Sequence, residues 1–241
     1  MEDILWLIPA RSGSKSIKNK NIKLLNSKPL IDYRIQTALS LSKKNHVWVS
    51  TDSQLYADIA IKSGATIPFF RPAFLSTDNA SSMDVVLHAM DYAETSRLKF
   101  DLICLLEPTS PFVYLEDIVK AYNILKQDLS ADSIVAVKET RPNTFFIQDD
   151  NKYLDELAER LEKRIKLGRQ EFKRQVTPSG GFYMSRWASF IRNKTFYTKK
   201  TLGYLVPEEC SLEIDEPLDW KLAEFLISEE IVDISKIMNV K

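Results

Sequence analysis

Short hydrophobic runs alternate with amphipathic stretches along the first 140 residues of the chain. The runs are of strand length, several are rich in β-branched residues, and none has helical periodicity, which is typical of strands buried on both faces. They cover residues 4–8, 46–50, 66–70, 102–106 and 133–137. The intervening stretches have apolar residues three and four positions apart, which predicts helices. These cover residues 29–43, 53–64, 81–94 and 114–127.

This alternation predicts the fold class. Strands and helices in turn, at lengths suited to βαβ units, indicate an α/β fold with a mainly parallel sheet and helices on both faces. In such sheets ligands bind beyond the carboxyl ends of the strands. Each predicted strand is followed by polar, turn-forming or charged residues. We therefore expect these strand exits to meet at one edge and to form the functional site.

The pattern changes in residues 139–176, which are strongly charged. Leucine and isoleucine side chains form one helical stripe there, at positions 154, 157, 161, 165 and 167. We interpret this segment as an insertion in a single domain of residues 1–241, with a stripe that contacts either a second subunit or its own domain. The remainder predicts strands over 180–184 and 201–207 and a closing helix over 217–228.

Composition narrows the class of protein. The chain has 241 residues, of which 44% are hydrophobic, so it can bury a sizeable core. Its formal net charge is zero, so we expect no nucleic acid and no membrane surface as partner. The only cysteines, Cys104 and Cys210, lie far apart without metal-type spacing, which suits a reducing compartment. Without a signal peptide or a membrane-length run, a cytoplasmic protein is expected.

Positive charge is nevertheless concentrated in the loop after the first predicted strand. Six of the 33 basic residues lie between Arg11 and Lys28, and no Asp or Glu occurs from Ile4 to Ile31. The small residues of RSGS allow close backbone approach, and the loop amides together with Arg11 and Lys20 suit phosphate. The glycine spacings of the Walker loop and of the dinucleotide motif are absent. The loop therefore predicts a polyphosphate site of another class, the alternative being a solvated lysine-rich surface loop.

A pair of carboxylates lies near the other end of the chain. Glu213 and Asp215 are two residues apart, so on an extended segment both project on one face while Ile214 faces the core. Oxygen ligands of this kind suit a divalent cation, and magnesium in particular. The alternative interpretation is an exposed acidic strand end before a helix.

Several ordered motifs resemble those of the acylneuraminate cytidylyltransferases. The first is IPARSGSKSIKNKNIKLLNSKPLIDY, and the others are VSTD (49–52), RPAFLSTDNASS (71–82), LLEPTSP (105–111) and EIDEPLDW (213–220). Together they extend over nearly the whole chain. The resemblance implies a Rossmann-like nucleotidyltransferase fold and transfer of a cytidylyl group from CTP to a sialic-type nonulosonic acid. It also implies a homodimer in which an inserted segment such as 139–176 reaches across.

The resemblance also implies roles for individual residues, carried over by motif position. The triphosphate would be held by Arg11, Ser14, Lys15 and Lys20. Cytosine or ribose would be recognised by Asn21, Arg71 and Ser82. The acid sugar would be bound by Glu107, Thr109 and Ser110. Magnesium would be bound by Glu213 and Asp215, and the catalytic residues would be Arg11, Lys20 and Asp215.

The half of the chain that would bind the sugar departs from the family pattern. Glu107 stands where glutamine is common, no lysine lies near Thr144, and Thr177 and Ser179 replace an arginine and an asparagine. In the nucleotide half, Ser16 replaces a glycine. Drift within a tolerant pocket, or a local misalignment, would explain these differences. We favour a different explanation, namely that the acceptor is another acid sugar, such as legionaminic, pseudaminic or another modified nonulosonic acid.

Two other functions stay open at this point. The chain could bind a nucleotide without turnover, which an assay of pyrophosphate release would decide. It could also activate a sugar 1-phosphate on a related fold. Glu107 argues against that second alternative, because a carboxylate would repel an acceptor phosphate.

Overall fold

The computed structural model describes residues 3–140 and 175–238. In this part of the chain one sheet has the strand order β4-β1-β5-β7-β6-β8. Its members are β1 (Ile4–Pro9), β4 (Val47–Ser50), β5 (Leu102–Leu105), β6 (Ser133–Glu139), β7 (Val176–Arg186) and β8 (Thr201–Leu205). Two short strands, β2 (Leu24–Leu25) and β3 (Lys28–Pro29), pair with each other.

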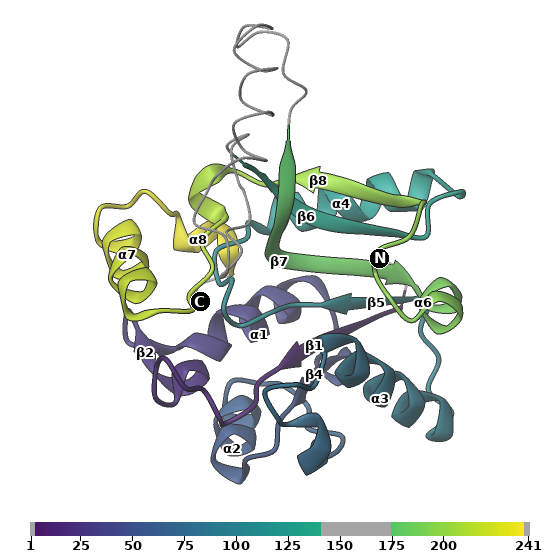
Figure 1. The fold of residues 1–241 in the computed structure, drawn as a ribbon, viewed down its shortest axis with the longest axis horizontal. Helices are drawn as coiled ribbons and strands as arrows, with labels where there is room; N and C mark the ends of the chain where they lie inside the picture. Colours follow the sequence, from purple (N-terminus) through teal and green to yellow (C-terminus); the bar gives the residue numbers. More distant parts are fainter. Residues whose placement is uncertain (1–2, 141–174, 239–241) are drawn as a thin grey trace, which may run out of the picture.

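The sheet is mainly parallel, as predicted. β1 pairs in parallel with β4 and β5, and β8 pairs in parallel with β6. β7 is antiparallel to both β5 and β6, so it is the one strand of this sheet that runs the other way (Figure 1). The carboxyl ends of β1, β4, β5 and β6 consequently lie along one edge, where the sequence predicts the site.

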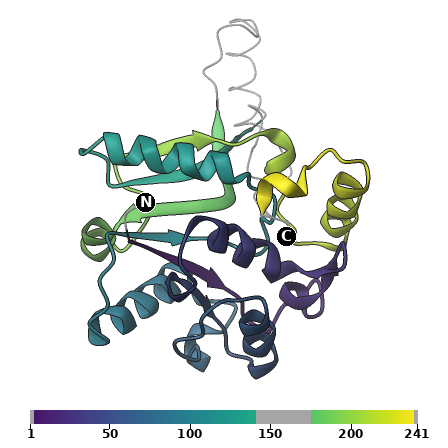
Figure 2. The same cartoon turned by 180° about the vertical axis from the view of Figure 1, so that it is seen from behind.

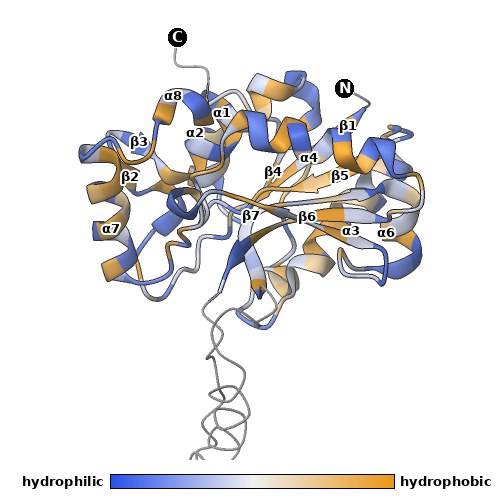
Figure 3. Cartoon of the chain, turned by 90° about the horizontal axis from the view of Figure 1, so that it is seen from above, coloured by the Kyte–Doolittle hydropathy of each residue, from blue (hydrophilic) through white to orange (hydrophobic). Residues whose placement is uncertain are grey.

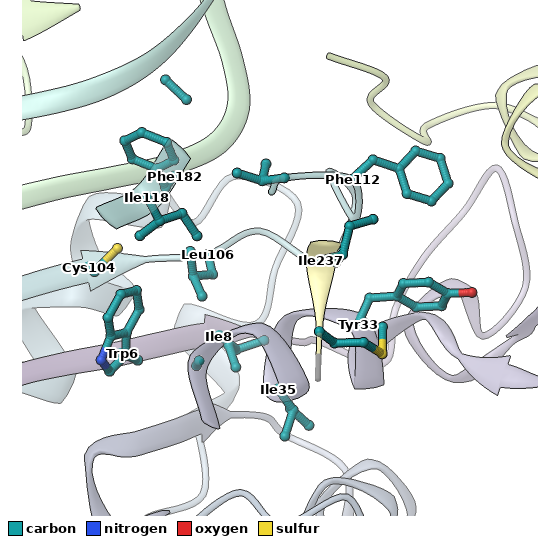
Figure 4. Close-up of a cluster of buried hydrophobic side chains, with 14 of the residues drawn as sticks. Trp6, Ile8, Tyr33, Ile35, Cys104, Leu106, Phe112, Ile118, Phe182 and Ile237 are labelled. Atoms are coloured by element: carbon teal, nitrogen blue, oxygen red, sulfur yellow. The ribbon is translucent and has the colours of Figure 1, made fainter. Parts of the chain in front are cut away.

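Helices cover both faces of the sheet (Figure 3). They are α1 (Leu30–Leu41), α2 (Gln54–Lys62), α3 (Ser82–Thr95), α4 (Leu115–Gln127), α6 (Trp187–Asn193), α7 (Pro217–Ser228) and α8 (Ile234–Ile237). Alternate residues of β1 face the two layers: Trp6 packs with α1 and α4, whereas Leu7 packs with α3 and α6. Figure 4 shows the first cluster, in which Ile118 lies beside Cys104 of β5 and Tyr33 lies near Phe112. No helix in the described part is long and apolar enough to cross a membrane.

The end of the chain returns to its beginning. α7 lies beside the β2 region in both views of the ribbon (Figures 1 and 2). Lys23 Nζ lies 4.1 Å from the centre of the Trp220 ring, which is a cation–π contact. The basic loop and the acidic segment before α7 are therefore neighbours in space.

The structure corrects two sequence predictions. Residues 66–70 form only isolated bridges, Trp48 with Thr66 and Thr51 with Phe70, instead of a strand. Pro68 has no N–H to continue a ladder. The strand predicted at 180–184 is longer than expected and antiparallel. It bends where Gly180 adopts a φ of +68°, a conformation that favours glycine.

The predicted insertion at 139–176, with its leucine stripe and Thr144, lies outside the described residues except at its ends. Those ends are adjacent, because Glu139 of β6 pairs with Val176 of β7. The segment therefore leaves and re-enters the fold between two paired strands.

Candidate functional site

A cavity of about 210 Å³ opens beyond the carboxyl ends of β1 and β5. Eight of the predicted site residues line it, and they come from the loop after β1, the Arg71 segment, the start of α3 and the exit of β5. They are Arg11, Ser14, Lys20, Asn21, Arg71, Ser82, Glu107 and Thr109. The structure thus brings together residues up to 98 positions apart. The other four, Lys15, Ser110, Glu213 and Asp215, do not line the cavity.

The basic loop after β1 is fixed at two points. Ser12 donates from its backbone N to Asp52 Oδ1 at 2.8 Å and from its Oγ to Asp52 Oδ2 at 2.9 Å. Asn21 donates from Nδ2 to the carbonyl of Arg11 at 3.1 Å. Asp52 was not among the predicted site residues, although its place at the exit of β4 could have identified it. The loop is held by its neighbours in a defined position at the cavity.

Asp78 contacts two of the cations predicted to hold phosphate. Its carboxylate lies 2.8 Å from Arg11 Nη2 and also forms an ion pair with Lys15 Nζ. Hydrogen bonds from Lys15 and then from Arg11 hold the pKa of Asp78 below its usual value. Asp78 was not among the predicted site residues, since nothing in the motif RPAFLSTDNASS marks this aspartate as a partner of the first loop. An anion that binds Arg11 must compete with Asp78.

Arg71 is a buried cation beside the cavity. Its Nε donates to Ser50 Oγ at 3.0 Å, and its Nη2 donates to the Ser50 carbonyl. Burial lowers its pKa to about 10, an effect that Asp52 opposes and Arg11 reinforces, so it stays charged at neutral pH. Ser82 reaches the cavity because Ser81 caps α3 and accepts from Asp84 N at 3.1 Å.

Glu107 brings negative charge to the end of the cavity near β5. Burial raises its pKa to about 6, and Glu213 and Asp215 act in the same direction. A hydrogen bond from Ser82 and the charge of Arg34 oppose this rise. At neutral pH the side chain is therefore mainly ionised, in an environment that disfavours its charge.

The turn after Glu107 connects the site to two other segments. Ile214 N donates to the carbonyl of Thr109 at 2.7 Å, which joins this turn to the acidic segment. Ser110 is fully buried, and its Oγ donates to the Ser179 carbonyl at 3.3 Å. The structure therefore places Ser110 behind the cavity wall, in contact with β7.

The acidic pair is engaged by lysines on both sides. Glu213 Oε1 lies 3.0 Å from Lys138 Nζ, and Asp215 Oδ1 lies 3.0 Å from Lys20 Nζ. Ile214 between them is buried, as predicted, but residues 211–215 form no strand. Lys138 was not predicted, although it lies at the carboxyl end of β6.

These carboxylates can be compared with what magnesium requires. Among residues 3–140 and 175–238, no group of three or more His, Cys, Asp or Glu side chains is arranged to hold a metal. Magnesium is usually bound through one or two carboxylates, with substrate phosphates and water completing its shell. Glu213 and Asp215 fit a magnesium ion of that kind, shared with a phosphate, and do not form a site made by protein alone.

The chain is similar to characterised proteins over nearly its whole length. A family model described as Cytidylyltransferase matches residues 5–214. The chain is 35% identical to CMP-N,N'-diacetyllegionaminic acid synthase of Legionella pneumophila, covering 93% of this chain and 96% of that protein. It is 29% identical to pseudaminic acid cytidylyltransferase of Campylobacter jejuni, covering 92% and 95%. It is 32% identical to N-acylneuraminate cytidylyltransferase of Escherichia coli, covering 91% of this chain but 51% of that protein.

Solved structures share the fold at low sequence identity. CMP:2-keto-3-deoxy-manno-octonic acid synthetase, complexed with CTP, has a TM-score of 0.65 at 15% identity and covers 95% of this chain and 99% of its own. 4-Diphosphocytidyl-2C-methyl-D-erythritol synthase has a TM-score of 0.62 at 11% identity, with coverage of 94% and 99%. These likenesses confirm the predicted nucleotidyltransferase fold.

Proposed function

Because the chain belongs to the cytidylyltransferase family, we propose that it transfers a cytidylyl group from CTP to a nonulosonic acid, forming a CMP-sugar and releasing pyrophosphate. The observation that carries this proposal is the cavity, which joins the basic loop, Arg71 and Glu107. The relatives named above are synthases and cytidylyltransferases of legionaminic, pseudaminic and acylneuraminic acids. That agreement supports a nine-carbon acid sugar as acceptor.

The nucleotide would occupy the part of the cavity between the basic loop and Arg71. Arg11, Ser14 and Lys20 would face the phosphates, with Lys15 at the rim. The positive charges of Arg11, Lys20 and Lys15 would neutralise charge on the departing pyrophosphate. Such electrostatic stabilisation, together with positioning, is the main task of a protein in phosphoryl transfer. Asn21, Arg71 and Ser82 would contact cytosine or ribose. A guanidinium and an amide can read the polar edge of cytosine, which offers both a donor and acceptors.

The acceptor would occupy the end of the cavity near β5, which we call the acceptor end and define by Glu107 and Thr109. Ser110 would act there from behind, through the turn it shares with Glu107. An ionised carboxylate accepts hydrogen bonds and favours a cationic donor. Glu107 therefore suits a sugar that carries an amino or amidine group better than one that carries only neutral amides.

Glu213 and Asp215 would bind a magnesium ion together with phosphate oxygens of CTP. Bound there, the ion would stabilise negative charge on those oxygens. In the structure the same two carboxylates form ion pairs with Lys138 and Lys20 at 3.0 Å each, so both already lie beside positive charge. We also propose that the protein is a homodimer, on the resemblance and on the position of the insertion between β6 and β7.

The test is an assay of pyrophosphate release by the purified protein. Each of the four nucleoside triphosphates is combined with magnesium and a panel of acid sugars, with a sugar 1-phosphate and a no-acceptor reaction as controls. We expect release with CTP and at least one nonulosonic acid. Activity with another nucleoside triphosphate but none with CTP would contradict the base assignment. Binding of CTP without any release would favour a non-catalytic nucleotide-binding protein.

A further inference from the structure

Arg34 is an unusual charged residue in the core of this protein. It lies on α1 and is 0% exposed. Its Nη2 donates to the carbonyl of Gly181, whereas Nε and Nη1 are buried and have no hydrogen-bond partner in the described part of the chain. Burying a charge with so few partners is costly unless an opposite charge lies close by. The structure must therefore supply a counter-charge.

Glu107 is the group that can supply it. Three groups would stabilise the positive charge of Arg34 if they were negatively charged, namely Cys104, Glu107 and Cys210. Burial raises the pKa of the Cys104 thiol far above neutrality and the pKa of the Cys210 thiol to about 12, so both thiols are neutral. Glu107, in contrast, is mainly ionised at neutral pH.

Backbone packing connects the same two residues. Arg34 holds the carbonyl of Gly181, and the adjacent Gly180 leaves no room for a Cβ against Ser110 Oγ. Ser110 N in turn donates to the Glu107 carbonyl at 3.1 Å. The guanidinium, the glycine corner of β7 and the turn after β5 are thus packed as one unit.

We propose that Arg34 is the buried counter-charge of Glu107 and stabilises the negative charge of its carboxylate at the acceptor end of the cavity. Two carboxylates, Glu213 and Asp215, and the burial of Glu107 all act against its negative charge. Arg34 is a cation that opposes them from inside the protein. It is a positioning residue that keeps this end of the cavity anionic. The proposal rests on the proposed function only in assigning that end to the acceptor sugar.

A double-mutant cycle on folding stability tests the pair without reference to any substrate. The variants are Arg34→Met, Glu107→Gln and the double variant, each unfolded in urea. We expect Glu107→Gln to stabilise the Arg34→Met protein more than it stabilises the unaltered protein. The difference should be at least about tenfold in the unfolding equilibrium constant, equivalent to ~1.4 kcal/mol. Additive effects would overturn the proposal.

Asp117 provides the matched control. It is a second buried carboxylate, 5% exposed, whose Oδ1 accepts from Tyr204 at 2.7 Å. It is not among the groups that act on the charge of Arg34. Arg34→Met and Asp117→Asn should therefore be additive. If Arg34→Met does not fold, the double variant with Glu107→Gln decides: a folded protein supports the pair, and an equally unstable one contradicts it.

Kinetics then separate positioning from simple support of the fold. Arg34→Met should raise the acceptor KM by about fivefold or more while the CTP KM changes by less than about twofold. Arg34→Lys, which keeps the charge, should recover part of the loss, and Arg34→Met should add nothing once Glu107 is Gln. Equal increases in both KM values would overturn the positioning role. If the unaltered protein uses no acid sugar, the proposed function fails, while the stability cycle still judges the pair.

Discussion

Lys20 Nζ lies 3.0 Å from Asp215 Oδ1, although 195 residues separate them in the sequence. The lysine is largely buried and the aspartate is 66% exposed. This contact joins the basic loop after β1 to the acidic segment before α7. Lys20, which would face phosphate, and Asp215, which would bind magnesium, therefore form an ion pair with each other in the structure. A triphosphate with its magnesium can replace each partner by a group of the same sign of charge, phosphate for Asp215 and magnesium for Lys20.

The basic loop can be tested first at Arg11. Arg11→Ala should lower turnover at least a hundredfold, by analogy with about 2.7 to 4 kcal/mol for loss of one preorganised donor. The reason is that the guanidinium lines the cavity where charge would develop. Steady-state release of pyrophosphate measures the change. Lys18→Ala is the matched control, because Lys18 is an exposed lysine of the same loop that does not line the cavity. A folded Arg11→Ala protein with an unchanged rate would make the loop an ordinary solvated surface.

The loop was predictable because its signal is local. An apolar run, a turn and a cluster of basic residues are contiguous, and the topology of a parallel sheet then places them at the carboxyl edge. Asp78 and Arg34 could not be found in this way. Asp78 pairs with Arg11, which is 67 positions away, and the counter-charge proposed for Arg34 is Glu107, which is 73 positions away. No periodic pattern connects either pair. The prediction of a strand at 66–70 was wrong although its signal is local. The composition is strand-like, but Pro68 interrupts the hydrogen bonding.

Asp78 should compete with CTP for the basic loop. Asp78→Asn should tighten CTP binding by about two- to fivefold, the range expected when an exposed ion pair is lost. The reason is that Arg11 and Lys15 would no longer have to break their ion pairs with Asp78 before they contact the phosphates. Isothermal titration with CTP and magnesium measures the dissociation constant. Asp58→Asn, at an exposed aspartate on α2, serves as the control and should leave it unchanged. Weaker binding in Asp78→Asn would mean that Asp78 contacts the nucleotide or its metal.

Magnesium dependence tests the acidic pair. Asp215→Asn should raise the magnesium concentration needed for half-maximal activity by about tenfold or more, because one oxygen ligand of a small shell is lost. Glu213→Gln should act in the same direction, and chelation should abolish activity of the unaltered protein. Activity as a function of magnesium concentration is the measurement. Asp219→Asn at the start of α7 is a control for local structure, since Asp219 accepts from the backbone N of Glu216 at 2.8 Å. An unchanged magnesium requirement in Asp215→Asn would remove it from the metal site.

The insertion makes a prediction about assembly. Charged substitutions at Leu157 and Leu161, on the apolar stripe that the sequence predicts, should convert a dimer to a monomer, because a charge at an apolar interface loses its solvation. Light scattering at micromolar concentration measures the mass. A monomeric unaltered protein would mean that the stripe packs on its own domain.

Glu107 makes the final prediction, which concerns the choice of sugar. A modified nonulosonic acid with an amino or amidine group should be used at least about tenfold better than N-acetylneuraminate, or ~1.4 kcal/mol in transition-state binding. Glu107→Gln should narrow this gap by weakening the binding of the preferred acceptor, since the amide keeps the shape and loses the charge.

The same preference should depend on pH. Burial, Glu213 and Asp215 raise the pKa of Glu107 to about 6, so the preference should also diminish as the pH falls through 6 and the carboxyl takes up a proton. In the Glu107→Gln protein the preference should not vary with pH across this range. Catalytic efficiency across the acceptor panel, at several pH values and for both proteins, is the measurement. If N-acetylneuraminate is already the best acceptor of the unaltered protein, the carboxylate does not select the sugar, and the differences from the family pattern at Glu107, Thr177 and Ser179 are drift in a tolerant pocket.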